Sequence, residues 1–488
     1  MKSAPFSLRH LFSEAQYVLV NRLVIPFAAF FLLILIGRQS SSLLGEYAIV
    51  TTFYFVLQVL PLMGLTPYVM REVARSPEKA GALMSTVGLL TQAACVILNL
   101  GLLALLHYLP YSHSVKSGIF VVGCAVFPGI LAFLAEIILI ALHKARAVAY
   151  GAAIENGIRL LWSAVLLYRG AEIQELMWVL FATRFFALLF YLHVMRAHYG
   201  IRLSLKPDSE ILRDTSLVLP VFLMNTLLYL VMTRLDFFML SLFESVEKVG
   251  YYATAYRLLE LGMMVWTSCL SALYPRFSKE FSSSGKRYTL LIQRSVRAAF
   301  LLLLPLSLLG FAAADKYVFF LFPKQYPHPV LLCEGFLLCF SIFGLDFLMT
   351  AFLNAADLQK EDLKAGFWGG LIYASLLLWW VPAYHLYGAL FAKAIATLFQ
   401  LIYRSRLLSR HFKLHLSQSE SLWLLGLIFF HGAFVSFFQY KSFYGQFVAL
   451  GVWLLALYPF WLWKSKTIKH FYALKSLVGK FKNTPNIS

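Results

Sequence analysis

The chain has 488 residues, of which 60% are apolar and only 13% are charged. Soluble proteins are roughly half apolar and a quarter charged, so this composition excludes an ordinary soluble protein. Apolar runs of about twenty residues recur along the chain, and each can cross the roughly 30 Å hydrocarbon core of a bilayer. A transmembrane β-barrel would instead show alternating segments of about ten residues. The sequence therefore predicts an all-α polytopic membrane protein.

Fourteen apolar segments are predicted to span the membrane. The first is preceded by Lys2 and Arg9, but it is too long for the apolar region of a signal peptide. The fourteen predicted spans are 17–36, 47–66, 83–107, 118–141, 147–167, 176–194, 215–237, 250–272, 295–313, 329–353, 364–384, 386–404, 421–440 and 444–463.

The net charge of +19 is explained by topology and does not indicate a nucleic-acid partner. With the N-terminus in the cytoplasm, the cytoplasmic loops and termini carry 26 Lys and Arg residues, whereas the opposite loops carry seven. Cytoplasmic segments of membrane proteins are enriched in these residues. We therefore predict a multi-pass protein with both termini in the cytoplasm.

The sequence around span 2 is echoed around span 8. Leu-Gly-Glu-Tyr-Ala around Gly45 opens span 2, and Val-Gly-Tyr-Tyr-Ala around Gly250 opens span 8. Pro67 and Pro275 are predicted to close those spans. The offset is six spans, which predicts two six-helix lobes related by an axis along the membrane normal. The predicted domains are an N-terminal lobe at 1–200, a cytoplasmic linker at 201–214, a C-terminal lobe at 215–415, and two extra helices with a basic tail at 416–488.

Ionisable residues inside the spans are the main candidates for function. Each costs roughly 2.5–3.5 kcal/mol on insertion scales, so such residues usually face a bundle interior or a water-filled cavity. Spacings of four and three residues allow Glu155 to pair with Arg159, and Arg257 with Glu260. A structural clasp is the simplest interpretation of the first pair. Residues at span edges, including Lys364 and Arg404, are expected only to extend towards the interface, and Arg22, Arg234 and Arg297 could do the same.

Polar residues at helical spacing form stripes on three spans. One stripe contains Asn225, Tyr229, Thr233 and Asp236, a second contains Asp346, Thr350 and Asn354, and a third contains Lys393, Thr397 and Gln400.

No metal-ligand spacing and no nucleotide-binding motif is present in the sequence. The five Cys residues lie within apolar runs and are interpreted as small core residues. We therefore expect no enzymatic activity, no cofactor and no metal site.

Three stretches carry a resemblance to a known family. Residues 234–277 start with Arg-Leu-Asp, continue with a Gly-x-Tyr-x-x-Ala-Tyr pattern from Gly250, and end near Tyr274-Pro275. Residues 64–74 begin with Gly64-Leu65 and carry Arg71 and Ala74 further on, in the family's Gly-Leu…Arg-x-x-Ala spacing. Leu353-Asn354-Ala355, at the end of the tenth predicted span, also fits the family pattern. The chain resembles the Wzx-type polysaccharide flippases of the multidrug/oligosaccharidyl-lipid/polysaccharide exporter superfamily.

The resemblance implies a two-lobe, MATE-like helical bundle. It implies export of isoprenoid-pyrophosphate-linked oligosaccharide across a bacterial inner membrane for O-antigen or other surface polysaccharide, with a polysaccharide polymerase as a partner. Arginine forks match phosphate oxygens. The predicted phosphate or acidic-sugar contacts are Arg22, Arg159, Arg184, Arg257 and Lys393, and the predicted polar lining is Asn225, Tyr229, Thr233, Thr397 and Gln400. Burial favours a protonated carboxylate, so the predicted H⁺ or Na⁺ coupling residues are Asp236, Glu155 and Asp346.

Three alternatives remain open from the sequence. A cation-coupled multidrug exporter and a lipid II flippase share the superfamily fold, although the arginine-rich opening of the lipid II flippases is not evident here. A third alternative is a membrane scaffold for glycosyltransferases and a polymerase, which would tolerate neutralisation of the intramembrane charges.

Overall fold

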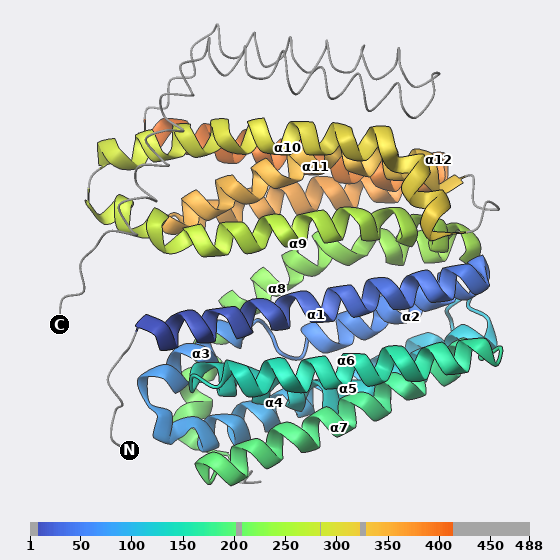
Figure 1. Ribbon diagram of the computed structural model, residues 1–488, viewed down its shortest axis with the longest axis horizontal. Coiled ribbons are helices and arrows are strands. Elements are labelled where there is room, and N and C mark those ends of the chain that lie inside the picture. The colour runs from blue at the N-terminus through green and yellow to red at the C-terminus, as the bar shows by residue number, and fades with distance from the viewer. Residues whose placement is uncertain (1–7, 202–206, 284, 323–327, 413–488) are drawn as a thin grey trace, which may run out of the picture. The chain divides into compact units, whose positions relative to one another are not determined.

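The computed structural model describes residues 8–201, 207–283, 285–322 and 328–412, and all regular structure in these ranges is helical (Figure 1). The elements are α1 (Leu8–Gln39), α2 (Ser41–Val59), α3 (Thr66–Arg75), the 3₁₀ turn η1 (Pro77–Lys79), α4 (Ala80–Leu106), α5 (His113–Ala141), α6 (Ala145–Tyr168), α7 (Ile173–Tyr199), α8 (Ser209–Phe243), α9 (Val246–Ser283), α10 (Gly285–Leu321), α11 (His328–Ala355) and α12 (Gln359–Phe412).

The first twelve predicted spans all fall on helices. Ten have a helix of their own, and the spans at 364–384 and 386–404 share α12. Within the described ranges, eight helical segments are long and apolar enough to cross a membrane; α6, α9 and the shorter apolar part of α1 are not among them. The spans predicted at 421–440 and 444–463 lie outside the described residues.

Polar caps and breakers set the helix boundaries. The Ser40 side chain accepts a hydrogen bond from the Leu43 amide, and the Asp208 carboxylate accepts from Glu210 and Ile211, so both satisfy amides at helix starts. α7 ends at Tyr199 and is capped by Gly200, which has φ of 64° and adopts the left-handed conformation that glycine tolerates.

The predicted roles of two prolines are wrong. Pro67 does not close span 2: α2 already ends at Val59, and Pro67 lies in the first turn of α3, where a missing amide hydrogen costs nothing. Pro275 does not close span 8, because it lies inside α9, which continues to Ser283. In α12 the break comes at His385, whose φ of 56° and ψ of −134° are not helical.

The echoed glycines meet where α2 packs against α9. A Cβ at Gly45 would lie 1.8 Å from the Val246 carbonyl oxygen, and a Cβ at Gly250 would lie 2.9 Å from the Gly45 nitrogen. Only glycine allows backbones to approach this closely, as small residues do where membrane helices pack. The equivalence of the two glycines in superposed lobes, and the domain limits predicted above, stay predictions.

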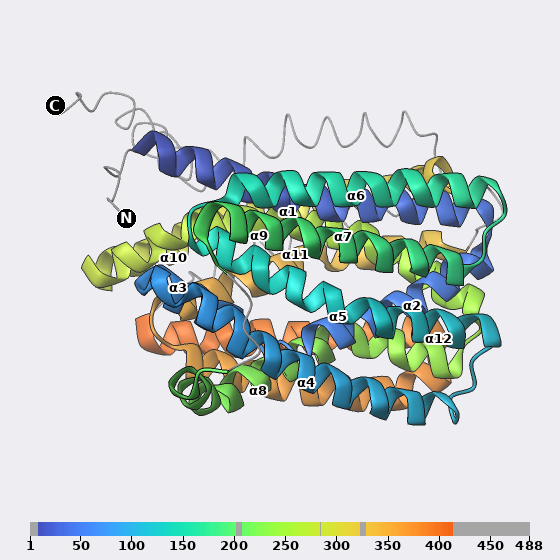
Figure 2. The ribbon, with the colours of Figure 1, turned by 90° about the horizontal axis from the view of Figure 1, so that it is seen from below.

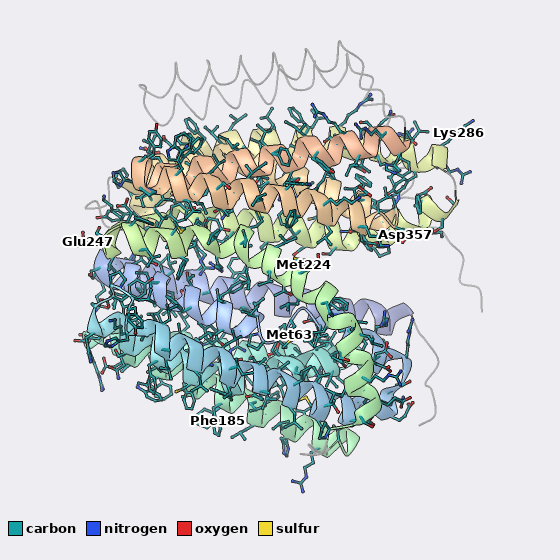
Figure 3. All side chains as sticks on the ribbon, turned by 180° about the vertical axis from the view of Figure 1, so that it is seen from behind. Met63, Phe185, Met224, Glu247, Lys286 and Asp357 are labelled. Atoms are coloured by element: carbon teal, nitrogen blue, oxygen red, sulfur yellow. The ribbon has the colours of Figure 1, made fainter. Side chains whose placement is uncertain are left out.

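Helix packing joins segments far apart in sequence. By its contacts the chain separates into two units, Met1–Ser307 with Ala314–Leu414 and Leu308–Ala313 with His415–Ser488, and every contact described below lies in the first. In that unit α5 packs on α7, α1 on α6, α11 on α9 and α12, and α8 on both α12 and α4 (Figure 2). Glu247 lies at one end of these helices, and Lys286 and Asp357 lie at the other (Figure 3).

Candidate functional site

Two arginines from neighbouring helices converge on one carboxylate. Arg257 Nη1 of α9 donates to Glu260 Oε2 at 2.7 Å, as its spacing predicts. Arg234 Nη2 of α8 lies 3.6 Å from the other carboxylate oxygen, Oε1. These three side chains, here called the arginine site, are between 19% and 27% exposed and carry a net charge of +1.

Aromatic side chains extend the arginine site towards α2. The Arg234 guanidinium carbon lies 4.3 Å from the ring centroid of Phe55, a cation–π contact. The Phe55 ring lies 6.2 Å from that of Tyr229, which is half exposed. The site therefore combines cationic forks with aromatic faces, the two features that suit a phosphorylated ligand with a sugar or isoprenoid next to it.

Lys393 of α12 forms a sealed pair with Asp236 of α8. Lys393 Nζ lies 2.7 Å from Asp236 Oδ2, and the Tyr252 hydroxyl donates to the same oxygen at 2.7 Å. The Asp236 side chain has no exposed surface, and Lys393 Nζ lies 4.2 Å from the Tyr256 ring centroid. Because both charges are buried and matched, this lysine pair stabilises the α8–α12 contact only while both partners remain.

A second sealed group lies between α5, α6 and α7. Arg159 hydrogen-bonds Glu155, the clasp that the sequence predicts, and its Nε donates to Thr183 Oγ1 at 3.2 Å. Arg184 Nη1 lies 3.4 Å from Glu155 Oε2 and 3.9 Å from Glu136 Oε1. The two arginines and two glutamates, here called the α5–α7 charge cluster, balance one another.

Arg404 is buried, so the expectation that it extends towards the interface is wrong. Its Nη1 lies 2.6 Å from both Asp346 oxygens, its Nε donates to Asp362 Oδ1 at 2.7 Å, and Nη1 also donates to Gln400 Oε1 at 3.3 Å. Three acceptors hold the guanidinium inside the protein. The two carboxylates and one arginine, here called the Arg404 cluster, carry a net charge of −1. Lys364, in contrast, is exposed and pairs with Glu361.

Of the remaining predicted site residues, some are exposed and others are buried. Asn225 is exposed and Thr233 is partly exposed, with Thr233 Oγ1 donating to the Tyr229 carbonyl at 2.7 Å. Thr397 and Gln400 are buried beside Lys393 on α12. Arg22 lies on α1 in a part whose side chains are not described. Among the described residues, no group of three His, Cys, Asp or Glu side chains is placed to hold a metal ion.

Of the predicted residues, Arg257 belongs to the arginine site and Tyr229 lies beside its Phe55 ring. Arg159, Arg184 and Lys393 instead each have a buried acidic partner. Sequence reasoning did not select Arg234 or Phe55 for this site. The Arg-x-Asp pattern at 234–236 was the available signal for Arg234. Nothing in the sequence places Phe55 beside it.

Comparisons with known proteins agree with this architecture. Residues 40–281 match the family described as "Polysaccharide biosynthesis protein". No curated protein sequence matches the chain. Among solved structures, the lipid II flippase MurJ in an inward closed conformation aligns with a TM-score of 0.70 and 14% identity, covering 94% of this chain and 99% of that one.

Two transporters of known structure also have a fold similar to that of this chain. An inward-facing MATE family multidrug resistance transporter aligns with a TM-score of 0.63 and 14% identity, covering 80% of this chain and 98% of that one. A MOP superfamily transporter from Pyrococcus furiosus, described as having a binding pocket of reverse polarity, aligns with a TM-score of 0.59 and 14% identity, covering 82% and 95%. The predicted all-α, MATE-like membrane fold is confirmed. Over residues 40–281 the chain is similar in sequence to the family described as "Polysaccharide biosynthesis protein", and its fold is similar to the folds of MATE family transporters and of the lipid II flippase MurJ.

Proposed function

We propose that the chain is a flippase that moves isoprenoid-pyrophosphate-linked oligosaccharide across a bacterial inner membrane for surface polysaccharide synthesis. The observation that carries this proposal is the arginine site, where Arg234 and Arg257 converge and keep part of their surface accessible. A pyrophosphate is a localised anion whose oxygens suit guanidinium forks. The match over residues 40–281 supports a polysaccharide pathway in preference to drug export.

Alternating access gives the site its mechanism. Two lobes that rock about a central site expose it first to one side of the membrane and then to the other. The close crossing at Gly45 and Gly250 lies where α2 and α9 start, the end assigned to the periplasm by the distribution of Lys and Arg. The arginine site would then load its ligand from the cytoplasm, while the isoprenoid tail stays in the bilayer.

Ion coupling is best supported at the Arg404 cluster. Asp236 is matched by Lys393, and the α5–α7 charge cluster is balanced, whereas Asp346 and Asp362 share one arginine. A proton or sodium ion would neutralise the extra carboxylate there. If so, Asp346→Asn should make export insensitive to the cation gradient, which can be measured as substrate uptake into inverted vesicles with and without that gradient.

The test of the proposed function is complementation of a strain that lacks the gene, scored by surface polysaccharide. Arg257→Ala should abolish export while the protein still inserts, and Arg257→Lys should recover only part of it, because a point charge does not reproduce a fork. The matched control is Arg276→Ala, an exposed arginine of the same helix. Normal polysaccharide with Arg257→Ala would exclude phosphate binding at this residue.

The same strain separates the alternatives. Loss of a multidrug exporter would sensitise cells to dyes and leave polysaccharide intact, and loss of a lipid II flippase would arrest wall synthesis. A scaffold would retain function in Arg257→Ala. Orientation is tested by a reporter that is active only in the periplasm: fused after Ser488 it should be inactive, because both termini are predicted to be cytoplasmic.

A further inference from the structure

Glu260 divides its carboxylate between two cations from different helices. Oε2 accepts from Arg257 at 2.7 Å, and Oε1 lies 3.6 Å from Arg234 Nη2. Two anionic oxygens between two guanidinium groups reproduce the arrangement that a phosphate group would take with the same arginines. Glu260 therefore occupies the position where the proposed ligand carries its charge.

The arginine site has more donors than Glu260 satisfies. Arg234 Nε is buried and donates to no atom of the described chain, although its guanidinium is stacked over Phe55. The contact between Arg234 and Glu260 exceeds the length of a hydrogen bond. Two arginines face one carboxylate, so the site retains one uncompensated positive charge. An added anion with several oxygens would supply the missing acceptors.

Glu260 can also leave the site at small cost. Ion pairs at this spacing on accessible helix surfaces contribute little to stability. Both partners of the Arg257–Glu260 pair keep about a quarter of their surface exposed, unlike Lys393 and Asp236 in the lysine pair. The carboxylate is thus held less firmly than the anions of the sealed groups.

We propose that Glu260 is a displaceable internal anion of the arginine site, which the pyrophosphate of the isoprenoid-linked substrate replaces on binding and which returns when the substrate leaves. This inference rests on the proposed function. The empty site is protected from repulsion between its two arginines. The bound pyrophosphate competes with a tethered carboxylate, which weakens its binding and promotes its release.

The test is binding of inorganic pyrophosphate, and then of farnesyl pyrophosphate, to the full-length protein in lipid nanodiscs, measured by titration calorimetry. Removing the competing charge with Glu260→Gln should tighten binding of both probes about tenfold, the effect of one charge-assisted contact. Glu260→Ala should tighten it as well. The control is Glu247→Gln, an exposed glutamate near the start of the same helix, which should leave the dissociation constant unchanged. Farnesyl pyrophosphate should bind more tightly than inorganic pyrophosphate if the site serves a lipid-linked ligand.

The outcomes separate this inference from the proposed function. If Arg257→Ala abolishes pyrophosphate binding and Glu260→Gln weakens it, Glu260 only positions Arg257; the inference is overturned and the proposed function stands. If Arg257→Ala binds pyrophosphate as the unchanged protein does, both the inference and the phosphate-binding role proposed for Arg257 are overturned. Size-exclusion profiles of all variants show whether each is folded, and tighter binding in a monodisperse Glu260→Gln protein supports the inference.

Discussion

Arg234 and Asp236 are two residues apart on α8, yet their surroundings differ completely. Asp236 is fully buried and matched by Lys393 and Tyr252. Arg234 keeps about a fifth of its side chain exposed, stacks on Phe55, and shares Glu260 with Arg257. Helical geometry turns residues two apart to different faces. One helix can therefore hold a sealed charge that stabilises the fold beside an accessible charge that is free to bind a ligand.

Intramembrane charges are therefore of two kinds, which differ in burial and in whether their hydrogen-bonding groups are satisfied. Burying an ion pair costs desolvation free energy, and such a pair matters for stability mainly because removing one partner leaves a buried, unpaired charge. A partly exposed arginine with unused hydrogen-bond donors can still bind an external anion. The lysine pair, the α5–α7 charge cluster and the Arg404 cluster belong to the first kind. The arginine site belongs to the second. Mutations should therefore affect stability in the first kind and transport in the second. Asp346 of the Arg404 cluster is the exception, because its proposed role in ion coupling adds an effect on transport.

The largest effect is expected from Lys393→Met. It leaves Asp236 buried and without its cation, which should cost about 3–5 kcal/mol of stability. The measurement is thermal unfolding of the detergent-purified protein, followed by size-exclusion chromatography. The double variant Asp236→Asn with Lys393→Met removes both charges and should recover most of the loss. A fully stable single variant would show that this pair is not sealed.

Gly45→Val tests whether the arginine site and the lysine pair depend on the α2–α9 crossing in the same way. A Cβ at Gly45 collides with the Val246 carbonyl oxygen, so the helices must separate, at about 1–3 kcal/mol. Phe55 lies ten residues further along α2 and would move away from Arg234, whereas the two charged residues of the lysine pair lie on α8 and α12. Export should fall in the complementation assay. The control is Gly101→Val, where nothing lies within 4 Å of an added Cβ. Equal export by both valine variants would refute the crossing as a requirement.

The sequence predicts the helix positions and the ion pairs within one helix, but it cannot predict the ion pairs between helices. Helix positions follow from the length of apolar runs, and the pairs Glu155–Arg159 and Arg257–Glu260 follow from spacing on one helix. Asp236 and Lys393 are 157 residues apart, so no local pattern joins them. Arg404 resembles an interfacial residue because it lies near the end of an apolar run, and only the folding of α12 against α11 brings Asp346 to it.

An effect on stability smaller than that of Lys393→Met is expected from Arg404→Lys. Arg404 reaches Asp346 through Nη1 and Asp362 through Nε, and a lysine ammonium cannot reproduce that fork. Losing one charge-assisted hydrogen bond should cost about 1.5–3 kcal/mol of stability. Thermal unfolding measures this loss. Arg257→Lys at the accessible site should change unfolding much less while still impairing export. If Arg404→Lys and Arg257→Lys lowered the free energy of unfolding equally, the distinction between sealed and accessible arginines would fail.

The smallest effect is expected from Lys364→Ala. Glu361 and Lys364 have the same i,i+3 spacing as Arg257 and Glu260, and their charged atoms are 2.8 Å apart, but Lys364 is mostly exposed. Exposed ion pairs contribute little, because water and salt screen them. Lys364→Ala should therefore leave both unfolding and polysaccharide export unchanged. Since spacing and bond length are nearly equal in the two pairs, a large export defect in Arg257→Ala alone would have to arise from what surrounds Arg257: a second arginine, a stacked phenylalanine and room for an added anion. If the two alanine variants behave alike, Arg257 and Glu260 form a clasp, and the ligand must bind elsewhere in the bundle.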